Sequence, residues 1–172
     1  MNTNERREIL RKKLAESTKP MTGTVLANEL GVSRQVIVGD IGILRAMGTK
    51  VYATPQGYII PSQIDTDSEA LIATIACSHD KQGVAKELEI IVDNGGKIRD
   101  VIVEHPLYGE IRADLMISSR RDINSFLAGL ERSGAGPLSV VTGGLHLHTI
   151  EVPSEEILQE IERELKENGI LR

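Results

Sequence analysis

LANELGVSRQVIVGDI, residues 26–41, has the pattern of two short helices joined by a tight turn. Val25, Leu26 and Leu30 are spaced so that they share one face of a helix. Gly31 can take the left-handed conformation that ends a helix. The polar and apolar residues after it continue as a second helix. Two short helices joined by such a turn form a helix-turn-helix.

The second helix begins with side chains that can read DNA bases. Ser33 is placed to cap it, and Arg34 and Gln35 follow with hydrogen-bond donors. In a helix-turn-helix the start of this helix enters the major groove, where such donors contact base edges. A surface helical hairpin would show the same pattern by itself. The candidates for base contacts are Ser33, Arg34, Gln35 and Val38.

Two short apolar segments around a turn follow. Residues 51–53 and 58–60 read as strands, and Pro55 and Gly57 stand where a type I turn places them. Ahead of the helix-turn-helix, residues 4–17 show helical spacing of three apolar side chains, Ile9, Leu10 and Leu14. Three helices and a two-stranded wing, in this order, are typical of a winged helix-turn-helix.

Contact with DNA phosphates is predicted near the wing. Lys50 and Gln56 are the candidates there, and phosphate contacts position a protein without specifying a base sequence. Gly39 and Gly42 depart from a strong helix pattern, because each costs about 1 kcal/mol relative to Ala. These glycines either weaken the second helix or permit close packing.

Charge separates this module from the rest of the chain. Residues 1–62 carry nine Lys or Arg and five Asp or Glu, whereas residues 63–172 carry 11 and 20. Residues 1–62 are therefore basic, although the net charge of the whole chain is −5. Because attraction to phosphate is screened beyond about 8–10 Å at physiological salt, an acidic second half does not cancel a basic half that faces DNA.

Composition favours a globular protein with an aliphatic core. The chain has no Trp, one Phe and three Tyr. Its one cysteine, Cys77, allows no disulfide framework and is expected to be buried. No apolar run reaches membrane-spanning length, and no signal peptide is recognisable. We therefore expect a cytoplasmic protein that does not bind membranes.

A polar stretch at 61–67 marks a predicted boundary between domains at 1–62 and 68–172. Beyond it, strand and helix patterns alternate. This pattern predicts an α+β fold, a winged helix-turn-helix followed by a β-α-β-β-α-β domain with a terminal helix. The expected strands are 70–77, 98–104 and 110–117, the helices are 84–94, 121–133 and 154–168, and 138–152 is extended with a hairpin at Gly143-Gly144.

All four histidines lie in the predicted second domain, residues 68–172. His146 and His148 are two residues apart on a predicted strand, so both imidazoles lie on one face. His79 ends the first strand and Glu87 lies in the next helix, and a β-to-α connection can bring both to one rim of the sheet. Three imidazoles and a carboxylate suit Zn, Ni, Co or Fe(II), and not Mg or Ca.

Each of these residues also has an ordinary structural interpretation. A His-x-His pair in a strand is more often a surface or hydrogen-bonded pair than a pair of ligands. Glu87 can belong to the solvated face of its helix, with Lys86 and Glu89. His105, just before Pro106, is expected to stabilise a turn. The residues alone leave both interpretations open.

Several segments together resemble the niacin-responsive transcriptional repressor family, whose second domain is named for three histidines. They are the helix-turn-helix, His79, Glu87, Glu104-His105-Pro106-Leu107-Tyr108-Gly109 and Gly144-Leu145-His146-Leu147-His148-Thr149. The resemblance covers essentially the whole chain, and its DNA-binding half is of the biotin-repressor type. It implies a homodimeric repressor of niacin-uptake and NAD-synthesis genes, with nicotinic acid as co-repressor. The nickel or zinc site of the family corresponds to His79, Glu87, His146 and His148.

Residues that hold the effector are predicted from its chemistry. Nicotinate carries a carboxylate, which a metal with an open coordination position or a nearby cation can bind. Arg112, Arg120 and Arg121 are the candidate cations. A homodimer is expected because helix-turn-helix repressors read two half-sites of a double-stranded operator.

Two other functions are compatible with the same residues. A metalloenzyme would use the metal to activate water, with Asp80 and His105 as candidate bases, although no pattern in the sequence supports either. A metal-sensing regulator would use the metal itself as the signal. We predict a repressor and no catalytic residues.

Overall fold

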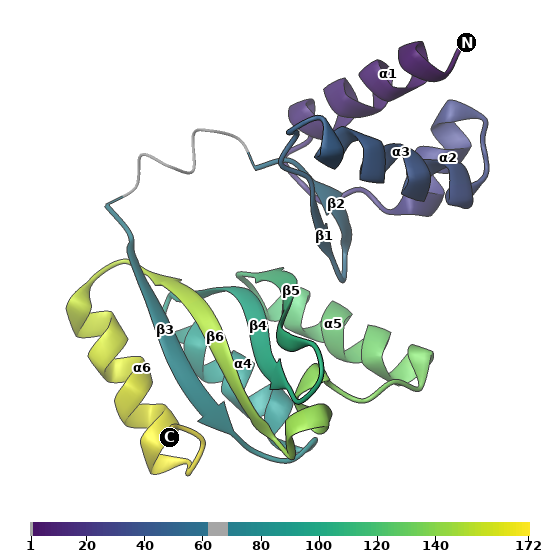
Figure 1. Cartoon of the computed structure of the whole chain (residues 1–172). Coiled ribbons are helices and arrows are strands. Elements are labelled where there is room, and N and C mark those ends of the chain that lie inside the picture. The colour runs from purple at the N-terminus through teal and green to yellow at the C-terminus, as the bar shows by residue number, and fades with distance from the viewer. Residues whose placement is uncertain (1, 62–68) are drawn as a thin grey trace. The chain divides into compact units, whose positions relative to one another are not determined.

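The computed structural model describes residues 2–61 and 69–172 (Figure 1). The chain divides into two compact units, Met1–Ser68 and Glu69–Arg172. Except for Pro61, the boundary stretch predicted at 61–67 lies outside the described residues. None of the described helices is long and apolar enough to cross a membrane.

The first unit contains the three helices and the two-stranded wing that the sequence predicts. β1 and β2 pair antiparallel, with Thr54 opposite Gly57 at the turn. An isolated bridge between Met21 and Tyr58 attaches the wing to the segment before the second helix. The elements are α1 (Thr3–Glu16), α2 (Gly23–Leu30), α3 (Arg34–Ala46), β1 (Tyr52–Thr54) and β2 (Gly57–Ile59).

Local signals set the turn between α2 and α3 as predicted. Gly31 has a φ of 64°, and the Ser33 side chain accepts a hydrogen bond from the Val36 N–H. One detail of the predicted helix face is wrong, because Val25 is 44% exposed while Leu26 and Leu30 are buried. Val25 precedes Leu26 by one residue, which turns it about 100° away from the core.

A buried carboxylate joins α1 to α3. Asp40 is 2% exposed, and its two oxygens accept from Arg6 Nε at 2.6 Å and Arg7 Nε at 2.9 Å. Burial by itself would raise the pKa of Asp40, but the hydrogen bonds and charges of both arginines lower this pKa below its usual range. The ion pairs therefore hold Asp40 ionised at the helix junction.

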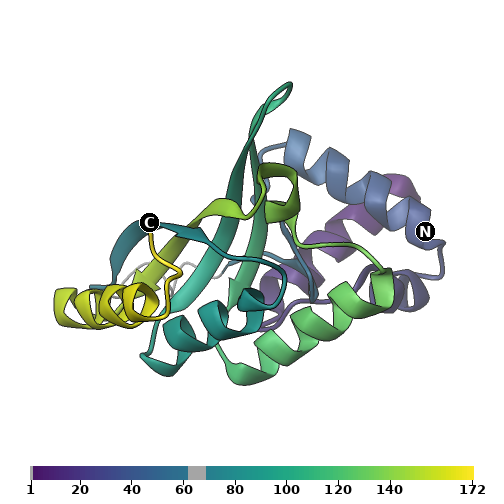
Figure 2. The ribbon, with the colours of Figure 1, turned by 90° about the horizontal axis from the view of Figure 1, so that it is seen from below.

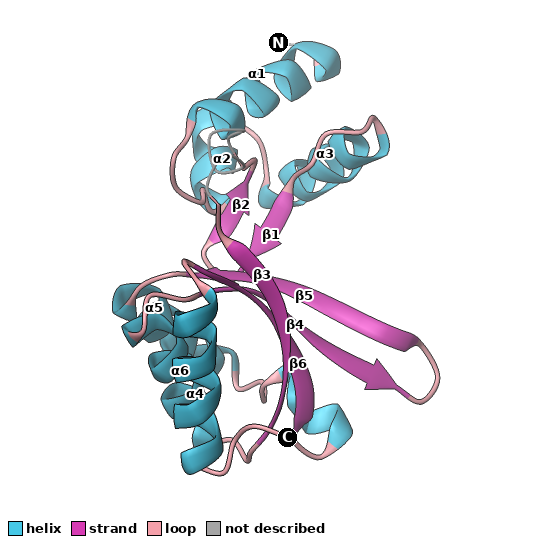
Figure 3. Ribbon diagram, turned by 90° about the vertical axis from the view of Figure 1, so that its left-hand side faces the viewer, coloured by secondary structure: helices cyan, strands magenta, loops and turns pink. Residues whose placement is uncertain are grey.

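The second unit is a four-stranded antiparallel sheet covered by helices on one face (Figure 3). The strand order is β3-β6-β4-β5, so the last strand lies between the first and the second. This arrangement confirms the predicted α+β fold. The elements are β3 (Leu71–Ser78), α4 (Gly83–Asp93), β4 (Lys97–His105), β5 (Gly109–Ile117), α5 (Arg120–Ser133), the 3-10 helix η2 (Leu138–Thr142), β6 (Leu145–Val152) and α6 (Glu155–Glu167).

Helix α4 occupies the middle of the helical layer, between α5 and α6 (Figure 2). Aliphatic side chains from the three helices pack on the sheet, and they include Leu88, Ile123 and Ile161. Cys77 is buried in this core, as predicted. The side chains of α4 that face the sheet therefore lie deep in the unit.

The prediction of a hairpin within residues 138–152 is wrong. The structure has the 3-10 helix η2 over Leu138–Thr142, and only Leu145–Val152 is a strand. Gly143 and Gly144, with φ values of 67° and 111°, turn the chain from η2 into β6. Because β6 already pairs with β3 on one side and β4 on the other, no place beside it remains for a hairpin partner.

Candidate metal centre and DNA-binding surface

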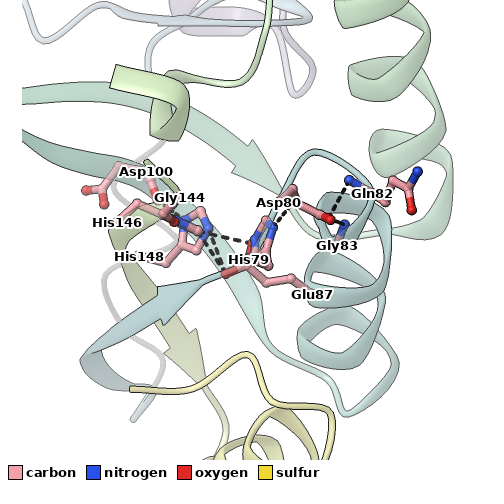
Figure 4. Close-up of polar contacts among 9 residues, drawn as sticks. All are labelled: His79, Asp80, Gln82, Gly83, Glu87, Asp100, Gly144, His146 and His148. Atoms are coloured by element: carbon pink, nitrogen blue, oxygen red, sulfur yellow. Dashed lines mark hydrogen bonds and ion pairs between the residues drawn. The ribbon is translucent and has the colours of Figure 1, made fainter. Parts of the chain in front are cut away.

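Three histidines and one glutamate converge between β6 and α4 (Figure 4). His146 and His148 lie on β6 and are each 3% exposed, with both rings on the face that the helices cover. Glu87, on α4, is 1% exposed and lies opposite them. His79 follows the end of β3. The prediction that Glu87 could belong to a solvated helix face is therefore wrong.

Glu87 lies at the centre of the cluster. Its Oε2 is 2.7 Å from His79 Nε2, and its Oε1 is 3.0 Å from His146 Nε2 and 3.4 Å from His148 Nε2. The His146 ring stands edge-on to both of the other rings, with centroids about 5 Å apart. All three Nε2 atoms consequently point to one small volume.

The other ring nitrogen of each histidine is held by a backbone carbonyl. His79 Nδ1 lies 2.6 Å from the Asp80 oxygen, and His146 Nδ1 lies 2.7 Å from the Gly144 oxygen. His148 Nδ1 lies 2.7 Å from the Asp100 oxygen. Because a carbonyl oxygen only accepts, each Nδ1 must carry the hydrogen. Without an ion, a second proton on Nε2 can be donated to Glu87. When that proton leaves, the Nε2 lone pair is available to bind a metal.

The electrostatics of the cluster keep the carboxylate ionised. Burial alone would raise the pKa of Glu87, but the charge on His148 and hydrogen bonds from the three imidazoles lower that pKa far below its usual range. The hydrogen bond to Glu87 raises the pKa of His79. Burial would lower the pKa of His148, yet attraction to Glu87 raises it.

The donor set fits a transition-metal ion. One ligand atom each from His79, Glu87 and His146 lies within 4.8 Å of the others, and His148 adjoins the same carboxylate. Neutral imidazole nitrogens with one carboxylate oxygen are ligands that zinc and nickel accept, whereas magnesium and calcium prefer oxygen alone. The four residues predicted to bind metal are thus brought together.

A cavity of about 30 Å³ adjoins the four side chains. This volume is large enough to hold a water molecule. Most of its remaining wall is apolar and includes Phe126, the only phenylalanine of the chain. Ser139 of η2 also lines it. The other residues of the wall are Val84, Leu88, Val101, Leu115, Pro137 and Leu138.

None of the three predicted effector-binding arginines lines this cavity. Arg112 is paired with Asp100 at 2.6 Å and with Glu110 at 3.3 Å. Arg120 binds Glu89 and Asp93 of α4. Arg121 is exposed at the start of α5. Their assignment to an effector stays a prediction without geometric support.

The two candidate catalytic bases both accept hydrogen bonds from nearby backbone N–H groups. Asp80 Oδ1 accepts from the backbone N–H groups of Gln82 and Gly83 and so shapes the start of α4. His105 Nδ1 accepts from the N–H groups of Leu107 and Tyr108, in the turn between β4 and β5. Both side chains thus shape turns, as the sequence indicates for His105.

The predicted DNA-reading residues lie on the exposed side of α3. Arg34, Gln35 and Val38 are all exposed, whereas Ile37 and Ile41 of the same helix are buried. The Ser33 hydroxyl caps α3. The two candidates for phosphate contacts lie where the wing begins and turns: Lys50 is exposed just before β1, and Gln56 is half-buried in the turn.

Sequence reasoning did not identify which groups hold the histidine rings. Asp80, Asp100 and Gly144 act through their backbone oxygens, which any residue type supplies. At position 144 the glycine itself is a signal in the sequence, because the backbone there has a φ of 111°, which favours glycine. Asp100 has none, since a single acidic residue in a strand pattern usually faces solvent.

Comparisons with known proteins match both units. Residues 72–172 match the 3H domain family, and residues 6–59 match an HTH domain family. The chain is 43% identical over 167 residues to a protein of Thermotoga maritima named probable transcription repressor NiaR. The alignment covers 97% of this chain and 93% of the relative. It is 38% identical over 171 residues to the transcription repressor NadR of Bacillus subtilis, over 99% and 94% of the two chains.

These matches confirm the resemblance seen in the sequence. Both relatives are aligned over nearly their whole length and are named as repressors, which also confirms the prediction that the protein is not an enzyme. The HTH match implies DNA binding through the first unit. The chain therefore belongs to the niacin-responsive family of 3H-domain transcription repressors.

Proposed function

We propose that this protein is a cytoplasmic, homodimeric repressor of niacin-uptake and NAD-synthesis genes, with nicotinic acid as its co-repressor. One observation carries the proposal. A buried cluster of three histidines and a glutamate adjoins an apolar-walled cavity, in the unit that follows a winged helix-turn-helix. The names of the relatives support repression of genes of NAD metabolism.

In this proposal His79, Glu87, His146 and His148 hold a nickel or zinc ion. Bound there, the ion supplies an open coordination position for the carboxylate or ring nitrogen of nicotinate. The tethers from Nδ1 to backbone carbonyls orient the imidazoles before the ion arrives. This arrangement lowers the conformational cost of binding.

The apolar wall would receive the pyridine ring. Phe126 and Leu115 offer it a surface without hydrogen-bonding groups, and Leu138 does so from η2. In this proposal η2 or α5 shifts to admit the six-membered ring, because the cavity has a volume of only about 30 Å³. Effector binding is thereby coupled to a change in the shape of the second unit.

DNA recognition is assigned to the first unit. Arg34, Gln35 and Val38 would contact bases from the exposed side of α3, with Ser33 at its start, and Lys50 and Gln56 would contact phosphates. Two copies reading two half-sites require a dimer. A nicotinate-bound conformation with the correct half-site spacing binds the operator better, and by linkage the operator tightens nicotinate binding.

Operator binding measured at fixed salt tests the proposal. The metal-loaded protein is titrated onto the upstream regions of niacin-uptake and NAD-synthesis genes, with nicotinic acid or nicotinamide. We expect nicotinic acid alone to tighten binding. His146→Ala/His148→Ala should abolish stoichiometric metal and the nicotinic acid response while leaving a folded protein. Unchanged metal content in that variant would remove the site assignment.

A metal-sensing regulator is the second candidate, favoured by the small volume of the cavity. In that case the ion itself shifts the protein to its operator-binding form. DNA binding would then respond to a chelator and to added metal, and nicotinic acid would have no effect at saturating metal.

A further inference from the structure

A buried carboxylate outside the proposed ligand set lies in the sheet beside the metal cluster. Asp100 of β4 is 5% exposed, at the point where the register of β4 shifts against both β5 and β6. Such an irregularity interrupts the backbone ladder. Asp100 Oδ1 accepts a hydrogen bond from the Thr149 N–H at 3.0 Å. The side chain therefore satisfies a backbone donor of β6 at the irregularity.

The same residue holds the neighbouring histidine. The backbone oxygen of Asp100 accepts from His148 Nδ1 at 2.7 Å. Two consecutive residues of β6, His148 and Thr149, are thus both bound by Asp100, one through its main chain and the other through its side chain. A displacement of Asp100 must move the carbonyl that sets the orientation of the His148 ring.

An arginine fixes the carboxylate of Asp100. Arg112 Nη1, from the edge strand β5, lies 2.6 Å from Asp100 Oδ2 and 3.5 Å from Thr149 Oγ1. The Asp100 side chain is 7% exposed and the Arg112 side chain is 47% exposed. His148 and Ile150 face the helices, so Thr149 between them points to the opposite face of the sheet. The ion pair lies with Thr149 on that face.

We propose that Asp100, held by Arg112, is a positioning residue for the metal ligand His148. The inference rests on the proposed metal site. The ion pair lies on the open face of the sheet, and His148 lies on the covered face. The effect passes from the Asp100 carboxylate to the Asp100 carbonyl, which holds the His148 ring. Arg112 therefore affects the site across the sheet, rather than as an effector contact within the cavity.

The substitution Asp100→Asn tests this inference. The amide has nearly the same shape and its oxygen can still accept from Thr149, but the charge that holds Arg112 is lost. The full-length protein is loaded with Co(II), Ni(II) or Zn(II), and metal affinity is measured by competition with a chelator. We expect the dissociation constant of the bound metal to rise by about tenfold or more. Such a loss is typical when a residue that orients a metal ligand is changed. The visible absorption of bound Co(II) should also change, because it reports ligand geometry.

Glu151→Gln is the matched control. Glu151 of β6 pairs with Arg99 of β4 at 3.0 Å, so it also joins these two strands by an ion pair. None of its hydrogen bonds reaches a metal ligand. We expect the affinity and the Co(II) spectrum to equal those of the wild type. Equal effects of Asp100→Asn and Glu151→Gln would indicate a general role in sheet stability and would overturn the inference.

A double-mutant cycle shows whether Asp100 acts through His148. In a His148→Ala background, Asp100→Asn should cause no further loss of metal affinity. An additional tenfold loss there would contradict the inference. Arg112→Gln should reproduce the effect of Asp100→Asn, and Arg112→Lys should restore part of the affinity. These arginine variants change a half-exposed side chain, so they also report on the inference if Asp100→Asn folds poorly.

Failure of the inference can be separated from failure of the proposed site. If the wild type binds no stoichiometric Co(II), Ni(II) or Zn(II), the metal site itself is wrong. If the wild type binds metal and Asp100→Asn binds it with the same affinity and the same Co(II) spectrum, only the positioning role of Asp100 is wrong.

Discussion

Gly83, the first residue of α4, lies directly against the side chain of His79. A Cβ at Gly83 would lie 2.6 Å from the Cβ of His79 and 2.9 Å from its Nδ1. Distances below 3.0 Å cannot persist, so any larger residue at position 83 must move the histidine or the helix. The absence of a side chain at Gly83 therefore allows His79 to reach Glu87, one turn further along α4.

Gly83→Ala is expected to weaken metal binding by at least about tenfold, because His79 can no longer keep its position relative to Glu87. Metal affinity measured by chelator competition checks this. Gly129→Ala in α5 is the control, since a Cβ there meets no atom of residues 2–61 and 69–172 within 4 Å. Equal metal affinities in the two variants would show that the contact does not matter for the site.

Removal of the metal is expected to destabilise the second unit alone. An ion present at 100 times its dissociation constant stabilises the folded state by about 2.7 kcal/mol. Amide hydrogen exchange should therefore become faster in β6 and α4 after chelation, and remain unchanged in α1 to α3. His146→Ala/His148→Ala should show no response to the chelator. Faster exchange across both units would contradict a local site.

Asp40 is expected to make the stability of the first unit depend on acid pH. Its pKa is lowered in the folded state, so its ion pairs contribute fully above the pKa of an unfolded aspartate, about 3.9. This contribution is lost as the pH falls through the folded pKa. Asp40→Asn should cost about 1.5–3 kcal/mol of unfolding free energy at pH 7. Hydrogen exchange in α1 and α3 between pH 7 and pH 3 measures both effects, and an unchanged acid response in the variant would contradict the assignment.

Gly39 and Gly42 are expected to weaken α3 without improving its packing. A Cβ at either position meets no described atom of the first unit within 4 Å, so close packing among those residues is not the reason for these glycines. Gly39→Ala and Gly42→Ala should each raise the stability of the first unit by about 1 kcal/mol. Gly31→Ala should have the opposite effect, because its φ of 64° strains any side chain although the space is open. Thermal unfolding of the three variants tests these signs.

Arg34→Ala and Lys50→Ala are expected to weaken DNA binding in different ways. If Arg34 pairs with a guanine, its loss costs about 1–3 kcal/mol on the operator and much less on unrelated DNA. Loss of a phosphate contact from Lys50 weakens both and reduces the salt slope by about one. Operator and random-sequence titrations at several salt concentrations separate these roles. Equal losses on both DNAs for Arg34→Ala would exclude base reading.

Local sequence signals specify the elements that depend on neighbours along the chain. The glycine at position 31 and the serine at position 33 set the turn between α2 and α3, because each acts within one helical turn. The same holds for His146 and His148, which share a face because a strand alternates every two residues. Resemblance to the repressor family rested on such local segments and was confirmed.

Which residues meet across the fold depends on long-range packing. Glu87 could have faced solvent, and it becomes the centre of the cluster because α4 lies between α5 and α6 against the sheet. Asp100 and Arg112 come from different strands, and their pairing depends on a register shift that no local pattern records. The strand order β3-β6-β4-β5 likewise depends on pairing between segments that are far apart in the sequence. Local periodicity tells which face of an element is apolar, whereas the choice of partner depends on how all the apolar faces are buried together.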